Sequence, residues 1–211
     1  MHSPAPALRE PDSLPLPDGE LQLYSGLPLG CEEATLLRRL VDDIDWRQEH
    51  VTLFGKTHKQ PRLVAWYGEP DACYTYSGKT YEPHPWNADL LGLKQLAEQA
   101  SASHFNSVLL NYYRDGRDSM GLHADDEPEL GPEPVIASLS LGATRTLYFR
   151  HRSRRDLATV NVPLPSGSLL VMRGKTQSNW KHGIRKVTRP CGPRVNLTFR
   201  HIIRQRGAGS I

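Results

Sequence analysis

Apolar residues recur every three or four positions in two stretches of the chain, 32–44 and 88–101, which is the spacing of an amphipathic helix. The apolar face of the first stretch consists of Ala34, Leu37, Leu40, Val41 and Ile44. That of the second consists of Leu90, Leu93, Leu96, Ala97 and Ala100. Asn87 directly precedes the second stretch, where its side chain can accept a hydrogen bond from a free amide of the first turn. We therefore predict two helices, the second capped by Asn87.

Most of the remaining sequence consists of short apolar or alternating runs separated by glycine, proline and charged residues, as is typical of strands and turns. The predicted strands are 50–54, 62–67, 105–113, 134–141, 144–150, 158–163, 168–173 and 194–202. Short strands packed this densely favour a sandwich or jelly roll. Because the helices precede most of the strands, the predicted fold class is α+β.

Two of the predicted strands carry polar residues in a regular pattern. In 105–113 the two-residue period places Leu109, Asn111 and Tyr113 on one side. In 194–202 every second residue is apolar, and the residues between them are Arg194, Asn196, Thr198 and Arg200. An ordinary solvent-exposed face would explain this alternation. A polar interior pocket that holds an anion would explain it equally, and the periodicity alone leaves both interpretations open.

The chain has 211 residues, a length that fits one domain able to bury a core without disulfide or metal staples. Five of its 17 prolines lie in residues 1–20, which we expect to form a flexible tail. We expect 20–203 to be one structural domain, with an N-terminal part at 21–104, a strand-rich core at 105–203 and a second short tail at 204–211.

Charge and cysteine content narrow the setting without identifying a function. The net charge is +3, which is compatible with a nucleic-acid partner but does not argue for one. No run of 18 apolar residues and no secretory signal is visible. The three cysteines form no CxxC motif, so we expect ordinary thiols in a reducing compartment. We expect a monomer in a bacterial cytoplasm, or in a nucleus if the source is eukaryotic.

A possible metal site begins with His123 and Asp125, which form a His-x-Asp motif. The motif is weak alone, because the chain contains nine histidines and chance matches are common. His182 is a candidate third ligand. Two imidazoles and one carboxylate on one face of the metal leave three positions open, which is the arrangement of non-haem Fe(II) oxygenases. Surface histidines beside a loop acid are the alternative.

If Arg194 lies inside a barrel, the site also needs an anion that pairs with it. A buried arginine is costly unless an anion pairs with it, and its planar group can bind a carboxylate through two hydrogen bonds. A dicarboxylic keto acid could therefore chelate iron at one end and meet Arg194 at the other.

At this point the chain resembles the AlkB family of Fe(II)- and 2-oxoglutarate-dependent dioxygenases. The segments that carry the resemblance, in matching order and spacing, are Asn111–Gly116, His123–Glu127, His182 and Arg194–Arg200. The resemblance covers roughly residues 50–203, and Arg194–Arg200 is its most specific part. It implies a double-stranded β-helix, a form of jelly roll, with nucleotide-recognition hairpins before it.

The resemblance also implies the roles of individual residues. His123, Asp125 and His182 would bind Fe(II), and Arg194 would pair with the distal carboxylate of 2-oxoglutarate; these four would form the catalytic centre. Other residues of the cosubstrate pocket would be Asn111, Tyr113, Asn196 and Arg200. The strand faces described above place the same residues together.

Within the family the chain looks most like the subgroup that repairs duplex DNA, although Tyr112 and Ala124 depart from the common pattern. The expected base and DNA contacts are Phe54, Arg62, Tyr74, Tyr76, Ser77, Asp126, Glu127, Arg150 and Arg152. Phe54 would fill the gap left by a flipped base. Tyr74 and Tyr76 would stack on the base, and Asp126 and Glu127 would face its positive charge.

The activity implied is oxidative demethylation of 1-methyladenine and 3-methylcytosine in DNA, which releases formaldehyde and consumes O2 and 2-oxoglutarate. A methyl group that blocks pairing lowers the cost of flipping the base out of the helix. The alternatives are the same chemistry on RNA or single-stranded DNA, an oxygenase acting on a protein or small molecule, and a non-catalytic nucleic-acid-binding module.

Overall fold

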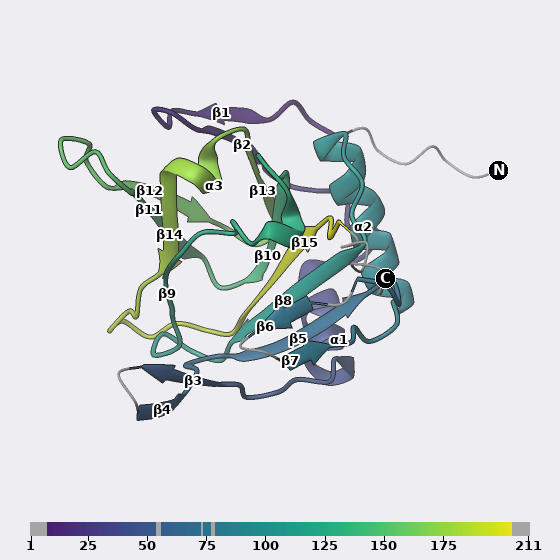
Figure 1. The fold of residues 1–211 in the computed structure, drawn as a ribbon. Coiled ribbons are helices and arrows are strands. Elements are labelled where there is room, and N and C mark those ends of the chain that lie inside the picture. Colours follow the sequence, from purple (N-terminus) through teal and green to yellow (C-terminus); the bar gives the residue numbers. More distant parts are fainter. Residues whose placement is uncertain (1–7, 54–55, 73, 77–78, 204–211) are drawn as a thin grey trace, which may run out of the picture.

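Two antiparallel β-sheets face each other in the computed structural model, which describes residues 8–53, 56–72, 74–76 and 79–203 (Figure 1). In spatial order the larger sheet consists of β1 (Asp12–Leu14), β2 (Glu20–Tyr24), β13 (Ser168–Arg173), β10 (Ile136–Gly142), β15 (Arg194–Arg200), β8 (Ser107–Tyr113) and β5 (Leu63–Gly68). The smaller sheet consists of β12 (Val160–Leu164), β11 (Arg145–His151), β14 (Trp180–Ile184) and β9 (Met120–His123). This pair of sheets is the predicted jelly roll.

Two hairpins and three α-helices complete the described chain. The hairpins are β3 (His50–Leu53) with β4 (Lys56–Lys59), and β6 (Tyr74–Tyr76) with β7 (Lys79–Tyr81). The helices are α1 (Glu33–Asp43), α2 (Ala88–Ser101) and the single turn α3 (Thr176–Asn179), and a 3-10 turn covers Pro128–Leu130. Among the described residues, no helix has the length and apolar character needed to cross a membrane.

The core has two layers, one on each side of the larger sheet. On the outer side α1 and α2 pack against the sheet through Leu40, Leu93 and neighbouring residues, which meet Leu197 and Phe199 of β15 (Figure 1). The second layer lies between the two sheets and includes Phe149. β15 therefore has a buried residue at all seven positions. Its apolar residues face the helices, and its polar residues face the space between the sheets.

Both predicted helices are confirmed within about one residue. The Asn87 side chain accepts a hydrogen bond from the Leu90 amide at 2.9 Å, which is the predicted cap. In α1 the buried residues include Leu36, whereas Ala34 is exposed, so the buried face is rotated from the predicted one.

The predicted flexible tail is corrected over Asp12–Glu20. β1 pairs with β2, and β2 pairs with β13 in the C-terminal part of the chain, so this segment forms the edge of the larger sheet. The turn between β1 and β2 is also anchored, because the Trp180 indole donates a hydrogen bond to the Pro17 carbonyl at 2.7 Å. The prolines at 15 and 17 lie outside the paired strands, where a missing amide hydrogen costs nothing.

The N-terminal part and the strand-rich core, which the sequence divides at residue 104, are not separate units in the structure. β5, from the N-terminal part, pairs with β8 along six residue positions and belongs to the same sheet as the core strands. The predicted single structural domain is consistent with this arrangement.

Candidate active site

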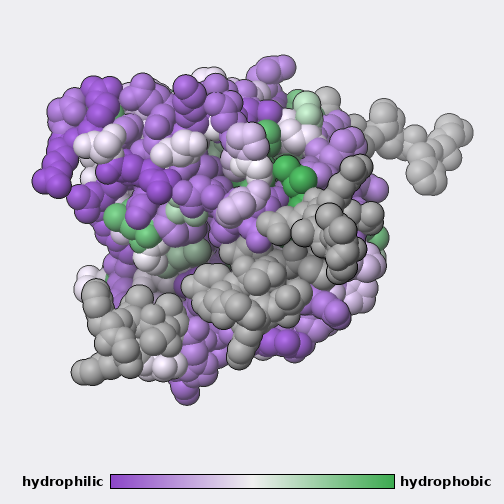
Figure 2. Space-filling view, in the orientation of Figure 1, coloured by the Kyte–Doolittle hydropathy of each residue, from purple (hydrophilic) through white to green (hydrophobic). Residues whose placement is uncertain are grey.

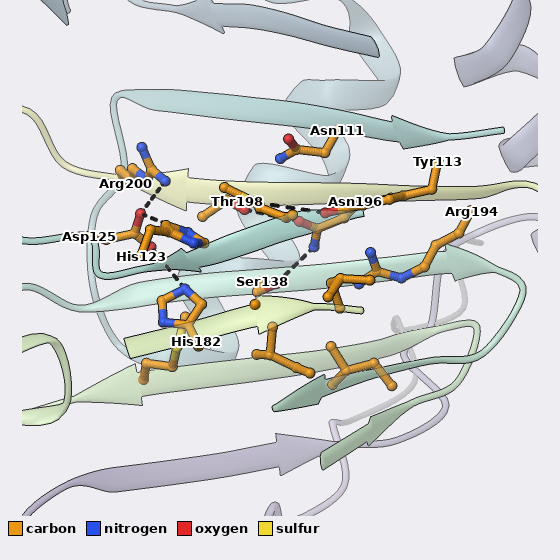
Figure 3. A pocket seen from close by; sticks show the side chains of 16 residues that line it. Asn111, Tyr113, His123, Asp125, Ser138, His182, Arg194, Asn196, Thr198 and Arg200 are labelled. Atoms are coloured by element: carbon orange, nitrogen blue, oxygen red, sulfur yellow. Dashed lines mark hydrogen bonds and ion pairs between the residues drawn. The ribbon is translucent and has the colours of Figure 1, made fainter. Parts of the chain in front are cut away.

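Three residues from two neighbouring strands meet at one end of the space between the sheets (Figure 3). His123 ends β9 and is paired in register with His182 of β14. Asp125 follows β9 by two residues. One potential ligand atom from each residue lies within 4.8 Å of the others. The His182 Nε2 atom is 3.8 Å from one Asp125 carboxylate oxygen, and the His123 Nε2 atom is 4.0 Å from the other.

Burial and nearby charges set the protonation of this cluster. Burial, together with the charge of His123, lowers the pKa of His182 to about 3. Burial alone would raise the pKa of Asp125, but the charges of Arg200 and the two histidines outweigh it and hold that pKa below its ordinary value. His182 is therefore neutral and Asp125 ionised near pH 7. This donor set can bind a divalent metal without first losing protons from these two ligands.

The position of Asp125 is fixed from two sides. Its backbone amide donates a hydrogen bond to the Gln177 side-chain oxygen at 2.9 Å, and Arg200 forms a hydrogen-bonded ion pair with its carboxylate. Gln177 is buried in α3, five residues before His182. The turn α3 therefore holds the metal-ligand loop and leads directly into the strand that carries the second histidine.

Arg194 lies at the opposite end of the cavity from the histidines (Figure 3). It is 1% exposed, and one of its terminal nitrogens donates to the Ser140 hydroxyl at 2.8 Å. Its Nε and Nη1 atoms are buried without a hydrogen-bond partner. Such orphaned donors are costly, and burial lowers the pKa of this arginine. A carboxylate that accepted from either of these nitrogens would offset part of this cost, so the residue fits an anionic ligand.

The amide groups of the cavity have defined orientations. The Asn196 NH2 group donates to the Ser138 hydroxyl at 2.8 Å, and its oxygen accepts from Thr198 at 3.2 Å. The Asn111 oxygen accepts from the Arg62 Nε at 2.7 Å. Because arginine can only donate, this bond directs the other end of the Asn111 amide, the NH2 group, toward a ligand. The cavity thus offers donors for the oxygens of an acid between its two ends.

This cavity lies between the two sheets. The larger sheet contributes its polar residues from β8, β10 and β15. The smaller sheet contributes the apolar wall residues Leu147, Leu164 and Ile184 in addition to the histidines. The interpretation of β15 as a strand with a polar interior face is confirmed, and the alternative of a solvent-exposed face is wrong.

The other predicted contact residues lie outside this cavity. Asp126 and Arg152 are exposed and form an ion pair with a separation of 2.5 Å. Arg150 is exposed on β11, opposite Lys181 of β14. Glu127 is half-buried directly after Asp126.

Four predicted base contacts cannot be placed in the same detail. Phe54 and Ser77 lie outside the described residues. The backbone of Tyr74 and Tyr76 forms β6, whose period of two puts them on one face of the hairpin, but their side chains are outside the description.

Several further residues shape the site, although their sequence signal is weak or absent. Ser138 and Ser140 alternate with leucines on β10, and this two-residue period was a signal for a polar inner face. Gln177 gave no comparable signal, since it lies in a short polar segment whose contact with Asp125 spans 52 residues.

Comparisons with known proteins agree on one family. Residues 20–200 match the model of the 2OG-Fe(II) oxygenase superfamily. The chain is 44% identical over 188 residues to alpha-ketoglutarate-dependent dioxygenase alkB homolog 3 of Mus musculus, which covers 85% of this chain and 65% of that protein. It is 40% identical over 182 residues to the DNA oxidative demethylase ALKBH2 of Mus musculus, which covers 82% of this chain and 76% of that protein.

A solved structure supports the fold alone. The structure of OsALKBH1 superposes with a TM-score of 0.64 at 18% identity and covers 90% of this chain and 100% of that one. The chain spans less than two thirds of the length of its alkB homolog 3 relatives.

Proposed function

Because the chain belongs to the AlkB family within the 2OG-Fe(II) oxygenase superfamily, we propose that it removes methyl groups from N-alkylated DNA bases by oxidation. The observation that carries the proposal is the cavity itself. A His-Asp-His cluster stands at one end, and a buried arginine with two orphaned donors stands at the other. A metal-chelating dicarboxylate satisfies both ends at once.

The residues present fit the Fe(II) and 2-oxoglutarate that the family implies. His123, Asp125 and His182 would hold the iron, with the three remaining positions open for cosubstrate and oxygen. Arg194 would hold the distal carboxylate, and Asn111 would donate to an oxygen of the same molecule. When bound, iron, cosubstrate and O2 supply an oxidant that hydroxylates the methyl carbon, coupled to decarboxylation of 2-oxoglutarate, and the hydroxymethyl product releases formaldehyde.

The protein's own residues line the pocket and hold its donors in defined orientations. The apolar wall from β11, β12 and β14 shields one side of the cavity. Arg200 holds Asp125 ionised and in place, so that this carboxylate keeps its negative charge beside the metal. Both effects favour a fixed geometry at the reacting centre.

Substrate recognition belongs to the rim of the cavity. A base methylated on a ring nitrogen such as 1-methyladenine or 3-methylcytosine is cationic, and Asp126 with Glu127 would face that charge. Asp126 forms an ion pair with Arg152, so a cationic base that bound Asp126 would take the place of the arginine. Phe54, Tyr74, Tyr76 and Ser77 complete the proposed contacts with the flipped base.

Duplex DNA is the proposed substrate, acted on by a monomer in the cytoplasm or nucleus. Exposed cations at facing positions of two neighbouring strands, Arg150 on β11 and Lys181 on β14, support contact with a phosphate backbone. Single-stranded DNA and RNA are the competing substrates, because exposed cations attract any phosphate backbone.

The test loads the protein anaerobically with Fe(II) and 2-oxoglutarate, adds O2, and measures formaldehyde and repaired base. The substrates are one 1-methyladenine in a DNA duplex, in the same single strand and in matched RNA. We expect release that requires all three components and is fastest on the duplex. His182→Ala should abolish turnover while the protein stays folded.

Other results would change the conclusion in defined ways. Faster repair of the single strand or RNA would overturn the duplex assignment and keep the chemistry. Consumption of 2-oxoglutarate without base repair would point to an oxygenase with a protein or small-molecule substrate. Folded, iron-loaded protein that consumes nothing would favour a binding module.

A further inference from the structure

Arg145 is a fully buried cation that the function proposed above does not use. It is the first residue of β11 and is 2% exposed. No ion pair within the described ranges includes it. Burying an arginine without a carboxylate is costly, so its place in the fold needs another source of stabilisation.

Backbone carbonyls supply part of that stabilisation. The guanidinium donates to the carbonyls of Asp115 at 3.2 Å, Asp118 at 2.9 Å and Arg185 at 2.6 Å. The first two lie in the loop between β8 and β9, and the third directly follows β14. Arg145 therefore fastens two loops that are far apart in sequence. The Val187 amide bridges the same loops through the Gly116 carbonyl at 2.8 Å.

The Tyr113 ring connects this cation to the cosubstrate pocket. The Arg145 guanidinium lies 5.6 Å from the centre of the ring, and the Arg194 guanidinium lies 5.1 Å from the same centre. Two buried cations thus share one aromatic ring at the closed end of the cavity. The charge of Arg145 adds to burial in lowering the pKa of Arg194, whereas Tyr113 opposes it.

The carboxylates nearest in sequence to these contacts are already engaged. Asp118 is bound through both oxygens by Arg114, and Asp115 is bound by Arg117. Arg145 also keeps a buried Nε without a hydrogen-bond partner. The closed end therefore has an excess of positive charge that an anionic ligand would balance.

We propose that Arg145 is a positioning residue of the cosubstrate pocket. It holds Tyr113 and the two adjoining loops in place, and its charge favours a ligand with a distal carboxylate. The inference rests on the proposed function, since it assumes that the pocket takes 2-oxoglutarate. Arg145 touches no reacting atom and acts through Tyr113 and Arg194.

The experiment measures binding by anaerobic calorimetry to protein loaded with Mn(II). The two probes are 2-oxoglutarate and 2-oxopentanoate, which has the same chain length but no distal carboxylate. The variants are Arg145→Met, which removes the charge, and Arg145→Lys, which keeps the charge but cannot reach three carbonyls. Arg173→Met is the matched control, because Arg173 also binds a backbone carbonyl, that of Ser101, whereas the cation contacts of the Tyr113 ring are with Arg145 and Arg194.

We expect Arg145→Met to weaken 2-oxoglutarate binding at least tenfold and to change 2-oxopentanoate binding less than twofold. Arg145→Lys should fall between Met and wild type, and it carries the test if the Met variant does not fold. Arg173→Met should leave both affinities unchanged.

A change in thermal stability alone, with unaltered affinities in the folded variants, would overturn the proposal. Equal weakening for both probes would also overturn it, because a general structural role would not distinguish the distal carboxylate. Wild-type protein that binds Mn(II) but neither probe would refute the proposed function itself, and the inference with it.

Discussion

Burial changes the chemistry of individual side chains at both ends of the cavity. His182 is kept neutral, and Arg194 is held with two donors that nothing in the described protein accepts. The unpartnered donors of Arg194 are unfavourable without an anion and favourable with one. The same residue that would stabilise a bound ligand therefore reduces the stability of the protein without it.

The pKa of His182 gives a pH dependence of stability in metal-free protein. An unfolded histidine has a pKa near 6.5, whereas that of folded His182 is about 3, so the unfolded chain binds the extra proton first. The protonation of His182 therefore leaves stability unchanged above pH 6.5, and stability falls as the pH drops below it, by at most about 1.4 kcal/mol per pH unit. Urea denaturation from pH 7 to pH 5 would measure it. His182→Gln should show a shallower decline, and equal slopes would contradict the prediction.

Arg62 determines the orientation of the Asn111 amide, and a substitution tests this at the cosubstrate. In Arg62→Met the Asn111 oxygen loses its donor, so the amide can turn and its NH2 group is no longer directed at the ligand. We expect a severalfold rise in KM for 2-oxoglutarate. Arg47→Met, which removes an exposed ion pair with Asp45, should leave that KM unchanged. An effect on kcat alone would argue against the orienting role.

The helices and strands that can be predicted from the sequence are those whose apolar residues coincide with the buried face of the element. α2 has its buried apolar residues Leu90, Leu93, Ala97 and Ala100 at helical spacing, and the bounds predicted for β13 are those of the structure. β14 was missed because its inward residues include His182, which breaks the apolar alternation, and Gly183 carries no side chain. Functional residues thus disrupt the hydrophobic pattern by which this strand could have been predicted. β1 was missed because prolines flank it, and pairing with β2 decides its structure.

Metal-ligand types and the Arg194–Arg200 pattern predicted the inner residues of the site. Positions reached only through the fold were not predictable, because Arg145 and Gln177 bind backbone groups 27 to 52 residues away. Such contacts leave no local pattern, since a carbonyl or amide is present at nearly every residue.

Gly142 is an element-level position where a side chain should be costly. Its φ is +92°, and an added Cβ would lie 2.3 Å from the Pro193 carbonyl oxygen, at the turn that joins β10 to β11. We expect Gly142→Ala to destabilise the protein by about 2 kcal/mol or more. Gly92→Ala is the control, because this glycine of α2 has open space around it. It should stabilise by about 0.5–1 kcal/mol. Denaturant titration of both variants would show whether the signs differ.

For the molecule as a whole, the placement of charged side chains on the surface matters more for nucleic-acid binding than the net charge of +3. Exposed surface in Figure 2 is mostly hydrophilic. The smaller sheet carries cations such as Arg150 and Lys181 on its outer side and the metal ligand His182 on its inner side. One thin layer therefore separates the proposed phosphate contacts from the iron site.

Nucleic-acid binding should weaken steeply with salt if these cations contact phosphates. Each lost contact lowers the slope of log K against log salt concentration by about 0.9 for duplex DNA. We expect the double variant Arg150→Gln and Lys181→Gln to bind more weakly and with a smaller slope. Arg38→Gln, exposed on α1, should match wild type. Fluorescence anisotropy at several salt concentrations would measure both, and an unchanged slope in the double variant would remove these residues from the interface.

The double burial of β15 has a consequence for how this protein can diverge. Its even-numbered residues line the cavity, and its odd-numbered residues pack against the helices. The strand therefore has no position at which a substitution would be neutral. In a library of all single substitutions, β15 should be an unbroken block of intolerance. β11 should instead alternate, with Thr146 and Arg150 permissive to stability selection. Substitutions that change substrate preference would then be found at the rim of the cavity and on the outer face of the smaller sheet, while the sequence of β15 stays unchanged.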